Sequence, residues 1–200
     1  MTGQAIGRAG QGEITRARLI RTARELFAER GYGGAGTEEI VSRARVTRGA
    51  LYHHFADKRD LFRAVYEQVE EEAVARTGAR MAEAGDPASV LRTGITAFLD
   101  LCTEPAMARI ALLDAPSVLG WQEWREIDLR YGLGLVVAGL RGGMDAGVIR
   151  PQPVVPLAHL LIGAISEAGM VIANADDPET ARAEVESPLL GLLDGLQAPG

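Results

Sequence analysis

The fold of this 200-residue chain is decided by residues 37–55, which read TEEIVSRARVTRGALYHHF. Apolar residues recur at helical spacing in the first half of this stretch and predict a short helix over residues 37–44. Thr47 is a good N-cap for a second short helix that ends near Phe55. The three residues 45–47 form the connection, and two short helices joined in this way are typical of a helix-turn-helix.

The second helix of this pair has different inner and outer faces. Ile40, Ala44, Val46 and Leu51 can form one small core between the helices. The outward positions combine hydrogen-bonding side chains with a glycine that permits close approach, and they are Thr47, Arg48, Gly49, Tyr52 and His53. In a helix-turn-helix the second helix enters the major groove, where arginine can bind guanine through two hydrogen bonds. This surface is therefore predicted to bind DNA, although Tyr52 has an alternative role as a core aromatic residue.

Helices are also predicted on both sides of the motif. Apolar residues from Ile14 to Phe27 follow one helix face, and Gly31 is placed where a helix should end. The Gly-rich residues 1–12 have no apolar period, so we expect a disordered arm. Asp57 opens a long fourth helix that contains the acidic run 70–72, which we interpret as a solvated face.

The remainder of the chain is predicted to be helical. Segments at about 87–103, 105–114, 121–146, 153–175 and 178–196 are divided by Pro, Gly and Asp residues, and no segment alternates with period two. The class is therefore all-α, with about nine helices. Five glycines between positions 132 and 143 predict a bend or close backbone packing in the seventh segment. Pro188 predicts a kink or a restart of the last helix near Ser187.

Composition places limits on the cell compartment and on the partners. The net charge is -6, but residues 1–60 carry +4 and the rest carries -10, which favours an N-terminal region that meets a polyanion. The single cysteine, Cys102, and the lack of a signal-peptide pattern favour the cytoplasm. The longest apolar stretch, Val154 to Ala173, contains Pro156 and Glu167, so we expect a buried helix and not a membrane span.

The N-terminal segment resembles the tetracycline-repressor (TetR) family. The resemblance runs from about residue 16 to residue 65 and rests on LIRTARELFAERGY followed by EEIVSRARVTRGALYHHFADKRDLFRAV. The residues that carry it are Gly49, Leu51, Tyr52, Phe55, Lys58 and Leu61. The resemblance implies a DNA-binding domain at 13–60 and a helical ligand-binding and dimerisation domain at 61–200.

The resemblance also implies roles for individual residues. Thr47 and Tyr52 would anchor phosphates or the adjoining bases, and Lys58 would hold the DNA backbone. The residues facing base edges would be Arg48, Gly49 and His53, with Thr37 approaching from the preceding helix.

The chain departs from the family pattern at two positions. Gly36 replaces the usual Thr or Ser cap, which costs a few tenths of a kcal/mol. Arg45 replaces the usual turn glycine; if the turn requires positive φ, it carries roughly 1 kcal/mol of strain. Arg45 would in return add a phosphate contact.

Beyond residue 70 the resemblance covers architecture only. It implies a pocket among the fifth to eighth helices and a homodimer interface on the last two. For the pocket we expect an apolar wall with three polar anchors, drawn from Phe98, Cys102, Met107, Arg109, Ile110, Leu113, Trp121, Trp124, Arg125, Tyr131 and His159. For the interface we expect the apolar stripes Leu157, Leu161, Ala164, Ile165, Ala168, Leu189, Leu192, Leu193 and Leu196.

Together these patterns predict a repressor that binds a palindromic operator as a dimer and is released by a small, largely apolar inducer. The alternative is a DNA-binding regulator without such a ligand, controlled by a protein partner or by oxidation of Cys102. An enzyme is not expected: the three histidines and one cysteine do not have the spacing of a metal site, and Gly132-Leu133-Gly134 lacks the preceding strand of a dinucleotide loop. No cofactor and no metal are predicted.

Overall fold

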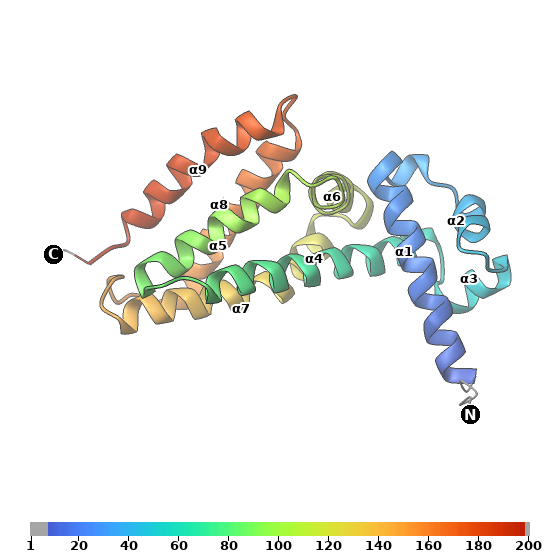
Figure 1. Cartoon of the computed structure of the whole chain (residues 1–200), viewed down its shortest axis with the longest axis horizontal. Coiled ribbons are helices and arrows are strands. Elements are labelled where there is room, and N and C mark those ends of the chain that lie inside the picture. The colour runs from blue at the N-terminus through green and yellow to red at the C-terminus, as the bar shows by residue number, and fades with distance from the viewer. Residues whose placement is uncertain (1–7, 199–200) are drawn as a thin grey trace.

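The computed structural model describes residues 8–198, and within this range the chain folds into α-helices and one π-helix without a strand (Figure 1). The elements are α1 (Arg8–Gly34), α2 (Thr37–Arg43), α3 (Arg48–His54), α4 (Lys58–Ala82), α5 (Pro87–Cys102), η1 (Met107–Asp114), α6 (Ala115–Leu119), α7 (Trp121–Asp145), α8 (Val154–Ala173) and α9 (Pro178–Asp194). The all-α prediction is confirmed. The predicted start of α4 and the predicted boundaries of α2, α3, α5 and α7 to α9 lie within about two residues of those observed.

Local sequence signals position the helix-turn-helix. The Thr47 side chain accepts a hydrogen bond of 3.1 Å from the Ala50 amide and so caps α3. Gly36 occupies the N-cap of α2 in an extended conformation and makes no side-chain cap. Ile40 and Leu51 are fully buried, so the predicted inner face is confirmed. As a result, α3 is held with its opposite face directed outward.

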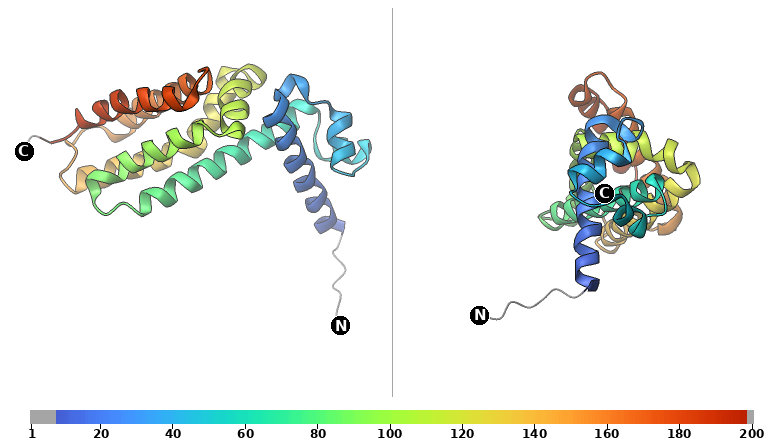
Figure 2. Two further views of the ribbon diagram at one scale, coloured as in Figure 1. Left: turned by 45° about the horizontal axis from the view of Figure 1, so that its top comes forward. Right: turned by 90° about the vertical axis from the view of Figure 1, so that its right-hand side faces the viewer.

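Helix α4 joins the two halves of the molecule. It starts under α1, where the Phe62 and Phe27 ring centroids lie 5.2 Å apart, and it runs beside α5 and α7 to Ala82 (Figures 1 and 2). Leu61, Phe62 and Val65 are fully buried near its start, and Ala73 and Met81 are buried further on. One rigid element therefore contributes to the core at both ends.

The glycines of α7 allow side chains to pack directly on its backbone. A Cβ atom at Gly132 would lie 2.9 Å from an Ile162 side-chain atom, and one at Gly139 would lie 2.5 Å from Leu91. The helix is uninterrupted from Trp121 to Asp145. The close-packing interpretation therefore holds for Gly132, Gly139 and Gly143, whereas Gly134 and Gly142 face open space. The predicted bend is not observed.

Two predictions about the chain ends need correction. Helix α1 begins at Arg8, so residues 8–12 are helical and do not form an arm; residues 1–7 lie outside the described range. Helix α9 continues through Pro188 without a restart at Ser187. Pro188 has no N–H to donate to the Glu184 carbonyl. Both residues lie on the solvent side of α9, where water can bind this carbonyl instead.

Helix α8 is buried on one side only, which corrects the expectation of a buried helix. By length and composition alone α8 could cross a membrane, because an 18-residue window within it has a mean hydropathy of 1.7. In the folded protein 39% of this window is buried. Its inner face packs against α5, α7, η1 and α9. Val155, Leu160 and Val171 remain exposed on the other side.

The turn between α2 and α3 predicts a stabilising substitution. Arg45 has φ 52° and is the non-glycine residue with positive φ in the described range. Glycine adopts this conformation without the strain of roughly 1–2 kcal/mol that other residues carry. It also makes the unfolded chain more flexible, which favours unfolding by about 0.4–1 kcal/mol. We therefore expect Arg45→Gly to raise the free energy of unfolding by roughly 0.5–1 kcal/mol in urea titrations. Arg45→Ala should give no such gain, because alanine keeps the strain; equal gains for both variants would contradict this account.

Candidate DNA-binding face and ligand cavity

The outward face of α3 presents the predicted DNA-binding side chains to solvent. Thr47, Arg48, Gly49 and His53 are exposed, and Tyr52 is 46% exposed. The alternative of Tyr52 as a core residue is therefore wrong. The Arg48 guanidinium carbon lies 5.6 Å from the centroid of the Tyr52 ring, so the two side chains form one stacked unit.

Two further predicted contacts flank this face. Arg45 is exposed at the turn before α3, and Thr37 is partly exposed at the start of α2. Neighbouring arginines are already paired, since Arg30 and Arg43 both form ion pairs with Glu39 at 2.8 Å. Arg45 and Arg48 have no ion pair within the described residues, so their charges can meet phosphate or base oxygens.

Lys58 takes part in a joint between the two halves. Its ammonium donates a 2.5 Å hydrogen bond to the Tyr32 carbonyl and lies 4.2 Å from the Tyr32 ring centroid. Burial lowers the pKa of Lys58, partly offset by the nearby Asp114. The Tyr32 amide in turn donates to Asp114 of η1 at 2.6 Å. The predicted phosphate contact of Lys58 stays a prediction.

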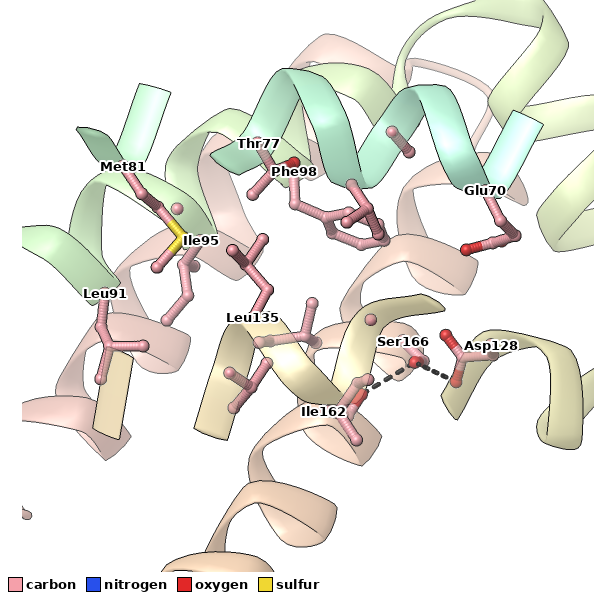
Figure 3. Close-up of a pocket in the computed structure, with 16 residues that line it drawn as sticks. Glu70, Thr77, Met81, Leu91, Ile95, Phe98, Asp128, Leu135, Ile162 and Ser166 are labelled. Carbon is pink, nitrogen blue, oxygen red and sulfur yellow. Dashed lines mark hydrogen bonds between the residues drawn. The ribbon is translucent and has the colours of Figure 1, made fainter. Parts of the chain in front are cut away.

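An apolar cavity lies between α4, α5, α7 and α8 (Figure 3). It contains about 610 Å³ of atom-free space, part of which is open to solvent. Its lining is mostly aliphatic: Glu70, Ala73, Val74, Thr77, Met81, Leu91, Gly94, Ile95, Phe98, Asp128, Gly132, Leu135, Val136, Ile162, Ile165 and Ser166. The lining is typical of a site for a largely apolar molecule. The enclosed space is about 70 Å³, so a ligand has to widen the cavity in order to enter it fully.

Three of the polar side chains of the cavity lie at one end. Glu70, Asp128 and Ser166 come from three different helices and lie near one another in Figure 3. The Ser166 hydroxyl is 2.8 Å from the Ile162 carbonyl and 3.4 Å from an Asp128 carboxylate oxygen. Arg125 forms an ion pair with Asp128 from outside the lining.

Glu70 is the most unusual of these groups. Its exposed fraction is 6%, and it has no ion pair in the described part of the chain. Burial, followed by repulsion from Asp128, raises the pKa of Glu70 to about 8, while the Tyr66 hydroxyl lowers it by hydrogen bonding. The expectation that residues 70–72 form a solvated face is therefore wrong for Glu70. The missed signal is its spacing with Tyr66, Ala73, Thr77 and Met81, which places it on the buried face of α4.

The structure brings only Phe98 of the predicted ligand residues to this cavity. Cys102, Met107, Ile110 and Trp124 are buried in the core, and the Trp124 indole donates to the Ala111 carbonyl at 3.0 Å. Leu113 and Tyr131 are partly buried outside the cavity, and Arg125 lies just outside its lining. The remaining side chains are exposed: Arg109, Trp121 and His159.

The predicted dimer stripes are also divided between core and surface. Leu161, Ile165, Ala168, Leu189 and Leu193 are buried within the chain and are unavailable to a partner, while Leu157, Ala164 and Leu196 are partly buried. Leu192 is 62% exposed. The apolar side chains that α8 and α9 turn to solvent are instead Val155, Leu160 and Val171 together with Leu192.

Comparison with known proteins agrees with both halves of this architecture. The family described as bacterial regulatory proteins, tetR family, matches residues 19–65. The family described as tetracyclin repressor-like, C-terminal domain, matches residues 88–196. The transposon Tn10 TetC protein of Escherichia coli is 33% identical over 122 residues, which is 60% of this chain and 60% of TetC. The chain therefore spans about 60% of the length of that relative.

Solved structures extend the similarity to the whole chain. A TetR-family transcriptional regulator from Pectobacterium atrosepticum has a TM-score of 0.86 and 35% identity, covering 96% of this chain and 98% of its own. FadR from Bacillus subtilis, a transcriptional regulator in complex with stearoyl-CoA, has a TM-score of 0.68 and 20% identity, covering 86% of this chain and 96% of its own. At that identity FadR is evidence for the fold alone.

The buried carboxyl of Glu70 predicts a specific pH dependence of stability. In the unfolded chain Glu70 ionises near its ordinary pKa of about 4.3, whereas in the folded protein it stays protonated up to a pKa of about 8. Between these two pKa values the folded state holds one proton more than the unfolded chain. Its free energy of unfolding therefore falls as the pH rises, by up to about 1.4 kcal/mol per pH unit. Above pH 8 this contribution levels off. Glu70→Gln should remove it in denaturant titrations at pH 5, 6.5 and 8.

A matched control is the exposed neighbour Glu71. Glu71→Gln should retain the pH dependence of the unmodified chain. A Glu70→Gln variant with that same pH dependence would show that Glu70 ionises normally in the folded protein.

Proposed function

Since the chain belongs to the tetracycline-repressor family, we propose that it is a cytoplasmic dimeric repressor released from a palindromic operator by a small, largely apolar molecule. The observation that carries the proposal is helix α4, which supports the DNA-binding motif with one end and walls the apolar cavity with the other. We assign residues 13–60 to DNA binding and residues 61–200 to ligand binding and dimerisation.

The contacts of α4 support a route for coupling. Arg59 donates hydrogen bonds to the Val118 and Leu119 carbonyls at 3.1 and 2.9 Å, and both Arg59 and Arg63 form ion pairs with Glu123. A molecule that displaces α4 at the cavity would move these contacts and the helix-turn-helix together. Coupling of roughly 1–3 kcal/mol is sufficient for such a switch, and operator DNA would weaken the ligand by the same factor.

The exposed apolar face of α8 and α9 supports dimerisation. Leu160 is 74% exposed, and Val171 and Leu192 are also exposed. One chain carries one helix-turn-helix, whereas a palindromic operator offers two half-sites about 34 Å apart. A two-fold contact across this face would supply the second motif.

The alternative control by oxidation of Cys102 has little support. Its side chain is fully buried, and burial raises the pKa of its thiol well above the usual range. A protonated, inaccessible thiol reacts slowly with oxidants. The apolar cavity favours the small-molecule proposal.

The DNA-binding role can be tested by selection of bound duplexes from a random library, followed by titration of the enriched sequence. We expect a two-fold symmetric sequence. Arg48→Ala should cost roughly 1–3 kcal/mol at one base position per half-site. Lys58→Ala should weaken binding to every sequence and reduce the salt slope by about one per lost phosphate contact.

A control for both variants is Arg141→Ala, an exposed position near the end of α7. It should bind DNA like the unmodified chain. The two assigned roles would be reversed if Arg48→Ala weakened binding equally for all sequences and Lys58→Ala changed the base preference. Failure to enrich any sequence would overturn the proposed function.

The dimer face predicts a change in mass. Leu160→Glu combined with Leu192→Glu would bury charges in the interface, so we expect sedimentation to give the 21.3 kDa monomer instead of twice that mass. Trp121→Glu changes another exposed apolar residue, outside this face, and should leave the dimer intact. A dimer that survives the double substitution would place the interface elsewhere.

A further inference from the structure

The polar end of the cavity points to the chemical class of the ligand. We propose that the cavity binds an elongated amphiphile whose protonated amine pairs with Glu70 while its apolar body lies along α4 toward Met81. This inference rests on the proposed function, because it names the ligand of the same cavity.

The carboxyl group of Glu70 is not balanced by a positively charged side chain. Asp128 is paired with Arg125, and Arg125 also reaches the Ser166 hydroxyl at 3.5 Å. Glu70 has no ion-pair partner within the described residues. Arg125 does not line the cavity. The one guanidinium near this end of the cavity is therefore paired with Asp128, and an ionised Glu70 requires a further positive charge to be stable in this apolar surrounding.

The shape of the cavity favours an elongated ligand. Thr77 lies two helical turns beyond Glu70 on the same face of α4, about 10 Å away at 1.5 Å per residue. Its hydroxyl is buried and has no hydrogen-bond partner in the described part of the chain. Figure 3 places Met81, Leu91 and Ile95 at the end opposite Glu70, where the lining is apolar. An amine at one end and a hydrocarbon or aryl body at the other match these surroundings.

Burial and the neighbouring Asp128 keep Glu70 largely neutral at pH 7. The ionisable groups around it are Tyr66 on α4, Cys102 on α5, and Arg125, Asp128 and Tyr131 on α7; α8 contributes the Ser166 hydroxyl. Asp128 repels a negative charge on Glu70, which together with burial raises its pKa to about 8. Binding of an ammonium group would ionise Glu70 and release its proton to solvent. Affinity for the amine should therefore rise roughly tenfold per pH unit between pH 6 and 7.5.

The test compares matched pairs of ω-phenylalkylamines and ω-phenylalkanols with two to six methylenes, titrated calorimetrically into the 200-residue protein. We expect at least one amine to bind at least tenfold more tightly than its alcohol at pH 7.5, with release of close to one proton at pH 6.5. The proton count comes from buffers of different ionisation enthalpy. Glu70→Gln should reduce amine affinity at least tenfold and abolish its pH dependence, while leaving affinity for the alcohol within about threefold. Glu71→Gln should behave like the unmodified chain.

The outcomes separate this inference from the proposed function. Equal or tighter binding of the alcohols, no binding by any amine, or amine binding that survives Glu70→Gln would each overturn the amine assignment. Operator binding, measured separately without ligand, tests the repressor role. A chain that binds operator but prefers alcohols would keep the proposed function and lose only the ligand class.

Discussion

The continuity of α4 is the constraint on which the rest of the structure depends. Leu61, Phe62 and Val65 close the core beneath the helix-turn-helix, and the same helix supplies Glu70, Thr77 and Met81 to the cavity. A helix transmits displacement along its axis because its backbone hydrogen bonds resist local bending. The ion pairs of Arg59 and Arg63 with Glu123 attach the start of this helix to α7.

The DNA-binding half was predictable because its signals are local. An N-cap at Thr47, apolar positions at Ile40 and Leu51, and a three-residue connection determine the motif within fewer than twenty residues. The strain at the turn was expected from the family resemblance on condition that the turn requires positive φ, and Arg45 has φ 52°. The outward side chains required no tertiary information, since a short helix with one buried face must expose the other.

The cavity was not predictable in the same way because four helices separated in sequence form it. The aromatic residues chosen from sequence, such as Trp124, fill the core, where large apolar side chains are most often buried. The cavity is lined instead by smaller side chains, and Gly132 on α7 accepts Ile162 in direct contact with its backbone. Glu70 was detectable only from its register with Tyr66 and Thr77, a signal that is easily lost within an acidic run.

Helix α8 has apolar side chains on both faces, and this explains why periodicity alone could not separate the core from the surface. Ile162, Ile165 and Ser166 face the cavity, whereas Leu160 and Val171 face solvent. Exposed apolar side chains on a helix face are typical of a surface that another molecule covers. If a second copy covers the outer face, α8 lies between the ligand and the two-fold axis while α4 lies between the ligand and the DNA-binding motif. A bound molecule would then act on the angle of each motif and on the separation between the two, so that a small displacement at the cavity is sufficient to misalign the dimer with its half-sites.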